Sequence, residues 1–267
     1  MKNVKRFLAL ISMLSFIFFF FVPLSYAQDA TRVDPKADKI LRDMSNYLKA
    51  QKQLTIKAET SYESIMDSGE KLTFFNQVEI SIKRPNKLYS HRIGMIRNQE
   101  IFYNGKTLTL FSLNNRLYAV ASVPSNLDEM LEFATEKLNL VAPGSDLLYS
   151  DVYEGLMSDV ISGSYIGQNI VNGRLCHHLA YRGGEVDWQI WIQAQGDPIP
   201  RKYVITSKWL TGAPEYTLTI NYWDSSSKIP DEKFQFDPPK DAKRINFLTP
   251  EQIKALTKKA KKAVKEN

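Results

Sequence analysis

The sequence has few of the residues that build covalent cross-links and metal sites. Among its 267 residues there are one cysteine, Cys176, and three histidines. A single cysteine excludes an intramolecular disulfide and any zinc or iron–sulfur site that needs several thiolates. The acidic residues are scattered singly, without the paired carboxylates typical of glycosidases. We therefore expect no bound metal, no cofactor and no catalytic residue.

The three histidines give little support to metal binding or to nucleophilic catalysis. His177 and His178 are neighbours in a predicted strand, so their side chains point to opposite faces of the sheet. Cys176 and His178 share a face, but side chains two residues apart in a strand stand about 7 Å apart, beyond a direct hydrogen bond. A structural pair is favoured, and an enzyme that uses a thiolate–imidazolium pair is the weakest alternative.

The net charge of +6 is unevenly distributed along the chain. Residues 1–27 contain three basic and no acidic residues, and residues 251–267 contain six lysines and two glutamates. The body between them, residues 28–250, carries 26 basic and 27 acidic residues and is close to neutral. Because nucleic-acid binding requires a basic surface, we expect no nucleic-acid partner.

The N-terminal residues have the pattern of a cleavable export signal. Three basic residues precede an apolar run over residues 7–22, and the small residues Ser25 and Ala27 stand three and one positions before a cleavage site at Gln28. An uncleaved membrane anchor is the alternative, but the run is short for a bilayer span of about 20 residues. We expect residues 1–27 to be removed and the protein to be periplasmic.

Hydrophobic periodicity predicts two helices and eleven strands. Asp34 as N-cap and Pro35 at the first helical position begin a helix that should end near Gln53. Ser125 and Asp128 form a capping pair ahead of a second amphipathic helix. The predicted strands include Leu54 and the alternating run at 74–82, and continue at about 86–93, 97–103, 106–112, 116–122, 160–170, 174–182, 186–194, 200–209 and 215–223.

The alternation within these strands places apolar side chains on one face of the sheet and polar side chains on the other. The apolar face needs a cover, and only the two helices and a loop-rich stretch at 141–157 can supply it. Helices this short can leave an apolar cavity beneath them, although an ordinary filled core explains the pattern as well. The sequence thus predicts a mainly β (α+β) domain with an antiparallel sheet whose concave face is covered by helices.

Three segments carry a resemblance to a known family. They are C-x-H-L-A from Cys176, V-D-W-Q-x-W-I from Val186 and P-x-P-R from Pro198. At these spacings they resemble the predicted periplasmic proteins catalogued as domain of unknown function 2092, over most of residues 35–240. The residues carried over as family markers, without a catalytic role, are Cys176, His178, Asp187, Trp188, Gln189, Trp191, Pro200 and Arg201.

That family is thought to be related to the LolA/LolB-type carriers of outer-membrane lipoproteins. The relation implies an eleven-stranded, incompletely closed antiparallel barrel, lidded by helices around a hydrophobic cavity. On this basis residues 28–248 form a single LolA-like β domain, and residues 249–267 form a basic helix or tail.

We predict that the protein is a soluble periplasmic carrier or binding protein for a hydrophobic ligand, such as a lipid or the acyl chain of a lipoprotein. The alternative is a non-enzymatic interaction module with a filled core, which docks on an envelope protein or a membrane surface through its open sheet edge or basic tail. In either case we expect a monomer. The predicted ligand-binding residues are Phe74, Val78, Ile80, Met130, Leu131, Ala134, Trp188, Ile190, Ile192, Leu218 and Ile220.

Overall fold

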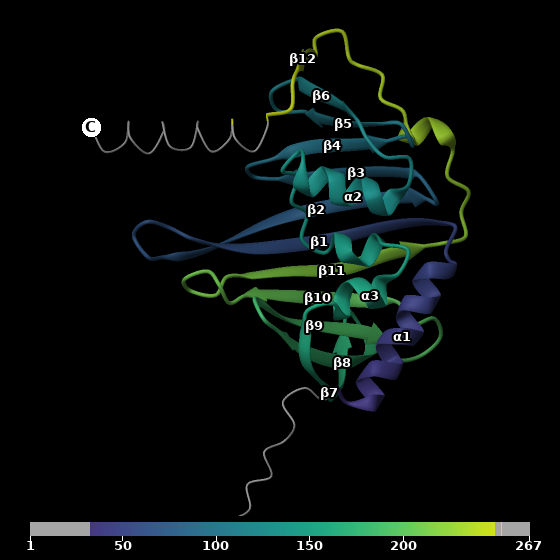
Figure 1. Ribbon diagram of the computed structural model, residues 1–267, viewed down its shortest axis with the longest axis vertical. Coiled ribbons are helices and arrows are strands. Elements are labelled where there is room, and N and C mark those ends of the chain that lie inside the picture. Colours follow the sequence, from purple (N-terminus) through teal and green to yellow (C-terminus); the bar gives the residue numbers. More distant parts are fainter. Residues whose placement is uncertain (1–32, 249–251, 253–267) are drawn as a thin grey trace, which may run out of the picture. The chain divides into compact units, whose positions relative to one another are not determined.

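The computed structural model describes residues 33–248 and residue 252, and its main feature is one twelve-stranded sheet (Figure 1). The strand order is β12-β6-β5-β4-β3-β2-β1-β11-β10-β9-β8-β7, so β12 and β7 are two separate edges and the sheet is not closed. Every neighbouring pair is antiparallel except β12 with β6. The predicted fold class, a mainly β, antiparallel and incompletely closed sheet with helices on one face, is confirmed.

The eleven predicted strands correspond in order to β1–β11. The strands are β1 (Gln53–Ile65), β2 (Lys71–Lys83), β3 (Lys87–Gly94), β4 (Asn98–Tyr103), β5 (Thr107–Ser112), β6 (Leu117–Ser122), β7 (Val160–Val171), β8 (Arg174–Gly183), β9 (Val186–Gln193), β10 (Pro200–Ser207), β11 (Glu215–Asp224) and β12 (Lys243–Ile245). Strand β12 was not predicted, because it has only three residues, all exposed, and therefore shows no alternation.

Helix α1 (Pro35–Ala50) begins as the sequence predicts and ends slightly earlier than the expected Gln53. The Asp34 carboxylate accepts a hydrogen bond from the backbone N–H of Lys36 at 2.7 Å, which satisfies one of the helix's first donors. Apolar residues at helical spacing form the buried side of α1, namely Ala37, Leu41, Met44 and Leu48. This side packs on the sheet.

Helix α2 (Leu127–Glu136) is present, but its predicted cap is wrong. The N-cap is Asn126, whose side-chain oxygen accepts from the backbone N–H of Glu129 at 2.8 Å, whereas Ser125 makes no capping bond. The Asp128 carboxylate instead accepts from the backbone N–H of Ser150 at 3.0 Å. The stretch predicted as loop-rich also contains a 3₁₀ turn, η1 (Ser145–Leu148), and a short helix, α3 (Val152–Met157).

All three helices lie on the same face of the sheet (Figure 1). Helix α1 packs against β7, β9 and α3, and here the core is filled. Trp188 stacks on Tyr181 with ring centroids 4.1 Å apart and meets the edge of Tyr203 at 5.9 Å. Ile190 and Ile192 are fully buried beside it. At this end of the sheet, aromatic and aliphatic side chains take up the space under the helices.

On the opposite face, the chain after β11 crosses the strands of the first half. This segment, residues 225–242, includes a second 3₁₀ turn, η2 (Asp231–Phe234). Phe236 packs against Phe102, Phe111 and Tyr118 with centroids 5.1–5.4 Å apart. The Lys233 ammonium pairs with Glu79 at 2.6 Å. The crossing brings β12 beside β6 and lengthens the sheet by one strand.

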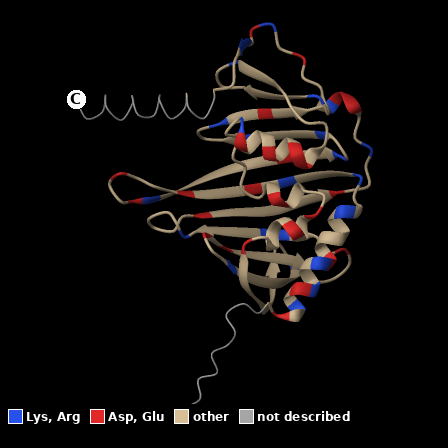
Figure 2. Ribbon diagram, viewed as in Figure 1, with Lys and Arg blue, Asp and Glu red and all other residues tan. Residues whose placement is uncertain are grey.

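Charged residues of both signs alternate along the outer side of α1 (Figure 2). Lys39 pairs with Asp43 at 2.6 Å and Arg42 with Asp38 at 2.8 Å, each one helical turn apart. Within residues 33–248, no helix has the length and apolarity needed to cross a membrane. The predicted export signal and the predicted basic tail at 249–267 fall on residues outside the described range, apart from Gln252.

The packing of α1 can be tested by truncation. Leu41 is fully buried between α1 and the sheet. We expect Leu41→Ala to lower the free energy of unfolding by about 2–5 kcal/mol, because it removes apolar contacts and leaves a cavity. Lys39→Ala, on the exposed side of the same helix, should change it by no more than about 0.5 kcal/mol. Urea unfolding followed by circular dichroism measures both, and equal effects would contradict this account of α1.

Candidate ligand-binding cavity

The apolar face of the sheet is not filled along its whole length. A cavity of about 560 Å³ lies between strands β1–β5 and β11 on one side and α2 with residues 139–145 on the other. This volume falls within the roughly 300–1,000 Å³ of sites for small organic molecules. Three large apolar residues that line it are exposed, namely Ile96 (55%), Val141 (67%) and Leu210 (39%). They place its mouth between the β3–β4 turn, the β10–β11 turn and the chain that follows α2.

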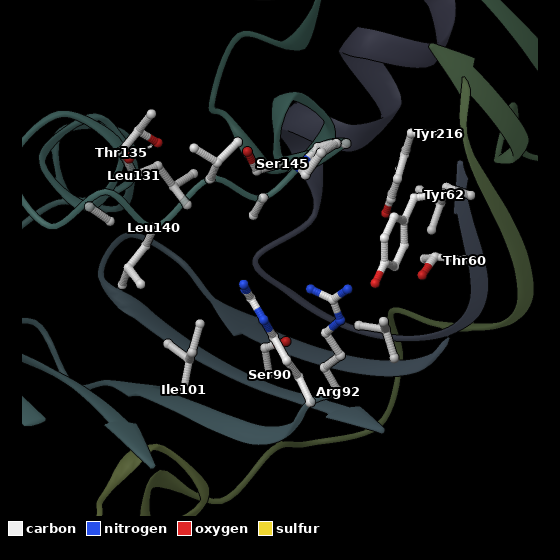
Figure 3. A pocket seen from close by; sticks show the side chains of 18 of the residues that line it. Thr60, Tyr62, Ser90, Arg92, Ile101, Leu131, Thr135, Leu140, Ser145 and Tyr216 are labelled. Atoms are coloured by element: carbon white, nitrogen blue, oxygen red, sulfur yellow. Dashed lines mark hydrogen bonds between the residues drawn. The ribbon is translucent and has the colours of Figure 1, made fainter. Parts of the chain in front are cut away.

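The side of the cavity near this mouth is polar. Tyr62 and Tyr216 stand opposite each other on β1 and β11, and Figure 3 shows their side chains next to Thr60 and Arg92. Burial raises the pKa of the Tyr216 hydroxyl to about 12, so the hydroxyl is neutral at physiological pH. The Arg92 guanidinium lies 5.8 Å from the centre of the Tyr62 ring, within the range of a cation–π contact.

A short chain of hydrogen bonds holds Arg92 in place. Its Nε donates to the Asn76 side-chain oxygen at 3.1 Å, and the Asn76 amide nitrogen donates to the Thr60 hydroxyl at 3.2 Å. Gly94 stands opposite Asn76 in the neighbouring strand. A Cβ at position 94 would lie 2.1 Å from the Asn76 oxygen, so only glycine leaves room for this side chain. The sheet itself therefore positions the arginine.

The opposite side of the cavity is apolar and comes largely from α2 and the chain that follows it. Figure 3 shows Leu131 and Leu140 there, facing Ile101 of β4. Asn139 adopts a left-handed φ of 54°, and the backbone N–H of Leu140 donates to the carbonyl of Ala134 at 2.9 Å. The left-handed Asn139 and this bond reverse the chain after the helix and turn Leu140 back toward the sheet.

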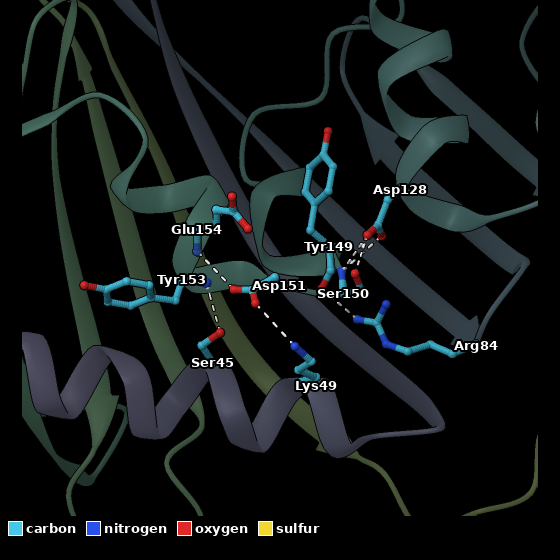
Figure 4. Close-up of polar contacts among 9 residues, drawn as sticks. All are labelled: Ser45, Lys49, Arg84, Asp128, Tyr149, Ser150, Asp151, Tyr153 and Glu154. Atoms are coloured by element: carbon cyan, nitrogen blue, oxygen red, sulfur yellow. Dashed lines mark hydrogen bonds and ion pairs between the residues drawn. The ribbon is translucent and has the colours of Figure 1, made fainter.

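The cavity is covered by α2 and the chain that follows it, residues 127–157. Polar contacts outside the cavity hold this cover in place (Figure 4). The Arg84 guanidinium donates to the carbonyls of Leu148 at 2.9 Å and Tyr149 at 3.1 Å. The Asp128 carboxylate accepts from both the backbone N–H and the hydroxyl of Ser150. These bonds tie the chain after η1 both to the β2–β3 connection and to α2.

A second set of contacts joins α3 to α1, also visible in Figure 4. The Ser45 hydroxyl accepts from the backbone N–H of Tyr153 at 2.9 Å. Asp151 caps α3 through the backbone N–H of Glu154 at 3.1 Å and pairs with Lys49 at 3.3 Å. The cover is therefore fixed on the side of α1, and residues 139–144 connect this fixed part to α2 across the mouth.

The structure brings together some of the predicted ligand-binding residues and separates others. Six of the eleven line the cavity, namely Val78, Ile80, Met130, Leu131, Ala134 and Leu218. Ile220 lines a small adjoining pocket of about 30 Å³. Phe74, Trp188, Ile190 and Ile192 line neither space: Phe74 stacks on Tyr62 at 5.3 Å, and the other three are buried in the core.

The polar lining residues were not among the predicted ligand-binding residues. Thr60 and Tyr62 continue the inward alternation of Ile56 and Ala58 along β1, and Arg92 stands four residues after the inward-facing Leu88 in β3. Extending that alternation to polar positions would have found them. The covering residues Asn139 and Leu140 have no such signal, because they belong to no strand or helix.

Cys176 and His178 have separate structural partners. Cys176 is fully buried, and burial raises the pKa of its thiol, which opposes thiolate formation. His178 stacks on Trp191 at 4.1 Å and bonds the Gln189 side chain at 2.9 Å. His177 hydrogen-bonds with the Tyr165 hydroxyl at 3.2 Å, on the face of β8 opposite to His178. Among residues 33–248, no three metal-binding side chains are grouped as a metal site requires.

Comparison with known proteins gives one family and several related structures. The profile of the family described as "Predicted periplasmic protein (DUF2092)" matches residues 37–248. No curated protein matches the chain.

Three similar solved structures each cover 74% of this chain. LprF from Mycobacterium bovis has a TM-score of 0.46 and 14% identity, over 97% of its own length. The lipoprotein LppX from Mycobacterium tuberculosis has a TM-score of 0.45 and 12% identity, over 100% of its length. A domain from Vibrio parahaemolyticus named for outer-membrane lipoprotein sorting has a TM-score of 0.33 and 8% identity, over 96% of its length.

The cover of the cavity should respond to pH through Asp146 in η1. Burial raises the pKa of this carboxyl above its ordinary value. A raised pKa in the folded state means that the ionised carboxylate costs stability at neutral pH, and that the cost disappears as the pH falls through the folded-state pKa. We expect Asp146→Asn to raise the free energy of unfolding at pH 7, with a smaller gain at about pH 4, near the ordinary aspartate pKa.

Asp151 is a control, because its pKa is shifted in the opposite direction. The backbone N–H of Glu154 and the Lys49 ammonium lower the pKa of its carboxyl. Its stabilising effect is present above the unfolded-state pKa and is lost as the pH falls through the folded-state pKa. Asp151→Asn should therefore destabilise the protein at pH 7 and do so less in acid. Urea unfolding at the two pH values measures both variants, and shifts of the same sign would contradict this assignment.

Proposed function

The chain belongs to the family of predicted periplasmic proteins DUF2092, and from this we propose that it is a periplasmic carrier or binding protein for a hydrophobic ligand. The ligand, a lipid or an acyl chain, occupies the cavity between the sheet and α2. One observation carries the proposal: a cavity of about 560 Å³ with an apolar interior, between the sheet and its helical cover. No bond-making or bond-breaking step is part of this function.

The driving force for binding is removal of apolar surface from water. Each methylene buried by the ligand contributes about 0.8 kcal/mol, and the lining residues Ile80, Met130 and Leu131 lose their own contact with water at the same time. This gain has to exceed an association cost of about 4 kcal/mol or more, so short chains bind weakly and long chains bind well.

The mouth suits the transfer of an apolar molecule. Ile96, Val141 and Leu210 are exposed and also line the cavity, so a chain that enters meets apolar side chains from the surface inward. Residues 139–144 cross the mouth between α2 and the fixed chain after η1. Their movement admits the ligand, while Arg84 and Asp128 keep the rest of the cover in place.

An interaction module is the second candidate, favoured by the open edge at β7. This strand exposes three isoleucines, Ile161 (46%), Ile166 (56%) and Ile170 (74%). Its neighbour in the sheet is β8, and its other side makes an isolated bridge between Gly163 and Val33. Such an edge can accept a strand from an envelope protein. However, β7 is interrupted by two register shifts, between Val160 and Ser162 and between Tyr165 and Gly167, and bulges of this kind protect edges against pairing. The cavity is therefore the stronger basis for function.

The proposal is tested on protein purified from the periplasm of a host that exports it. Organic extraction and native mass spectrometry should reveal a co-purified lipid, and the delipidated protein should take up a fluorescent acyl probe. The dissociation constant should fall by about fourfold per added methylene, the equivalent of about 0.8 kcal/mol, until the chain fills the cavity. Absence of both lipid and probe binding would remove the carrier function.

Filling part of the cavity should weaken this binding. Ala134 lines the cavity and is buried on α2. In Ala134→Trp the indole takes space otherwise open to the ligand, and loss of two buried methylenes, at about 0.8 kcal/mol each, weakens binding by about fifteenfold. Ala50→Trp at the exposed end of α1 is the control and should bind the acyl probe like the wild type. Fluorescence titration measures both, and equal affinities would show that the ligand lies elsewhere.

A further inference from the structure

The polar side of the cavity carries two arginines. Arg92 of β3 and Arg97 of the β3–β4 turn both line the cavity. Burial lowers the pKa of Arg92 and the nearby charge of Arg97 lowers it further, yet an arginine stays protonated at neutral pH. Two positive charges therefore face the same space, just inside its mouth.

Neither charge is neutralised by an acid of the described chain. Among residues 33–248, no ion pair includes Arg92 or Arg97, and the one hydrogen bond of the Arg92 guanidinium goes from Nε to the neutral Asn76 side chain. The terminal nitrogens of Arg92 make no hydrogen bond or ion pair with these residues. These unused donors are available to an anion that enters the cavity.

The two carboxylates that line the cavity are already engaged. Glu63 pairs with Lys71 at 3.0 Å and accepts from the backbone N–H of Glu215 at 2.9 Å. The Glu215 carboxylate accepts from the Thr206 hydroxyl at 3.0 Å. The donors that line the cavity on this side include the guanidinium groups and the hydroxyls of the two tyrosines beside Arg92.

We propose that the ligand is a single-chain amphiphile with an anionic head, a carboxylate or a phosphate, that binds to Arg92 and Arg97 near the mouth. Its apolar chain runs inward along Leu88, Ile101 and Leu131. A planar guanidinium matches both head groups, because each offers two oxygens to parallel N–H donors. The proposal rests on the proposed function, since it specifies the chemistry of the ligand in the same cavity.

The head lies at the mouth and the tail inside because of the order of residues along β3. Leu88 is almost fully buried (5% exposed) at the inner end of the cavity, Arg92 follows four residues later, and the turn with the exposed Ile96 comes next. The inner end of the cavity is thus apolar, and the positive charge lies near its mouth. A neutral lipid fills the inner part equally well but leaves both arginines unpaired.

The experiment compares four ligands with the same hydrocarbon chain: palmitic acid, hexadecyl phosphate, hexadecanol and hexadecylamine. Each competes with a neutral fluorescent acyl probe at pH 7.5, below its micellar concentration, on the delipidated full chain. For the wild type we expect at least one anion to bind about tenfold or more tighter than hexadecanol, as a charge-assisted hydrogen bond implies, and the amine to bind more weakly than the alcohol. The two anions distinguish a carboxylate head from a phosphate head.

Substitutions test whether the two arginines cause the preference for anionic ligands over hexadecanol. Arg97→Gln changes an exposed side chain with no ion pair in the described chain, and Arg92→Gln removes the half-buried charge. Each should reduce the anion-to-alcohol ratio severalfold and leave hexadecanol affinity within about twofold. Arg92→Lys keeps a charge and should retain part of the ratio. Arg182→Gln on β8, with 75% of the side chain exposed, is the charge-matched control and should leave the ratio unchanged.

The outcomes separate this inference from the proposed function. Equal affinity for the anions and hexadecanol overturns the anionic head while the acyl-binding function stands. A ratio that survives both Arg92→Gln and Arg97→Gln also overturns it. If neither the probe nor any of the four ligands binds the wild type, the proposed function itself fails. Should Arg92→Gln lose its cooperative unfolding transition because Asn76 loses its partner, Arg97→Gln and Arg92→Lys still decide the question.

Discussion

The helical cover is smaller than the apolar face it has to cover, and the cavity follows from this mismatch. A sheet with one apolar face gains stability only where another layer removes that face from water. At the β7–β10 end, α1 and α3 provide this layer, and Trp188 and Ile190 are buried beneath them. Over β1–β5 only α2 and residues 139–145 are available, and about 560 Å³ is left between the layers.

Such a space persists only if the cover cannot settle onto the sheet. Protein cores relax partly around a void, and this relaxation lowers the cost of the void. Here the cover is held from the side: Arg84 binds the carbonyl groups after η1, Asp128 binds Ser150, and Asp151 joins α3 to Lys49 of α1. These polar contacts set the height of the cover above the sheet. Directional bonds outside the cavity thus preserve an apolar volume inside it.

The fold was largely predictable because alternation is a local signal, whereas the shape of the cover was not. Strands such as β9 and β11 show their faces in their own residues, so eleven strands and both main helices could be read directly. The short strand β12 depends on the path of residues 225–242 across the far face, which no local pattern encodes. The same limit applies to the site. Met130 and Leu131 were expected from helical spacing, but whether Trp188 lines a space or fills one depends on which helix lies above it.

The residues that break the apolar pattern of the inner face are concentrated where the cavity opens. Thr60, Asn76 and Arg92 form one hydrogen-bonded chain across three neighbouring strands, and the absence of a side chain at Gly94 makes room for it. Deep in the core, a charge in this network would cost several kcal/mol. Close to the mouth, the guanidinium keeps part of its hydration while the cavity is empty, so the desolvation cost stays small until a ligand arrives. Placing the charge at the entrance therefore lets one cavity combine an apolar interior with a site for an anion.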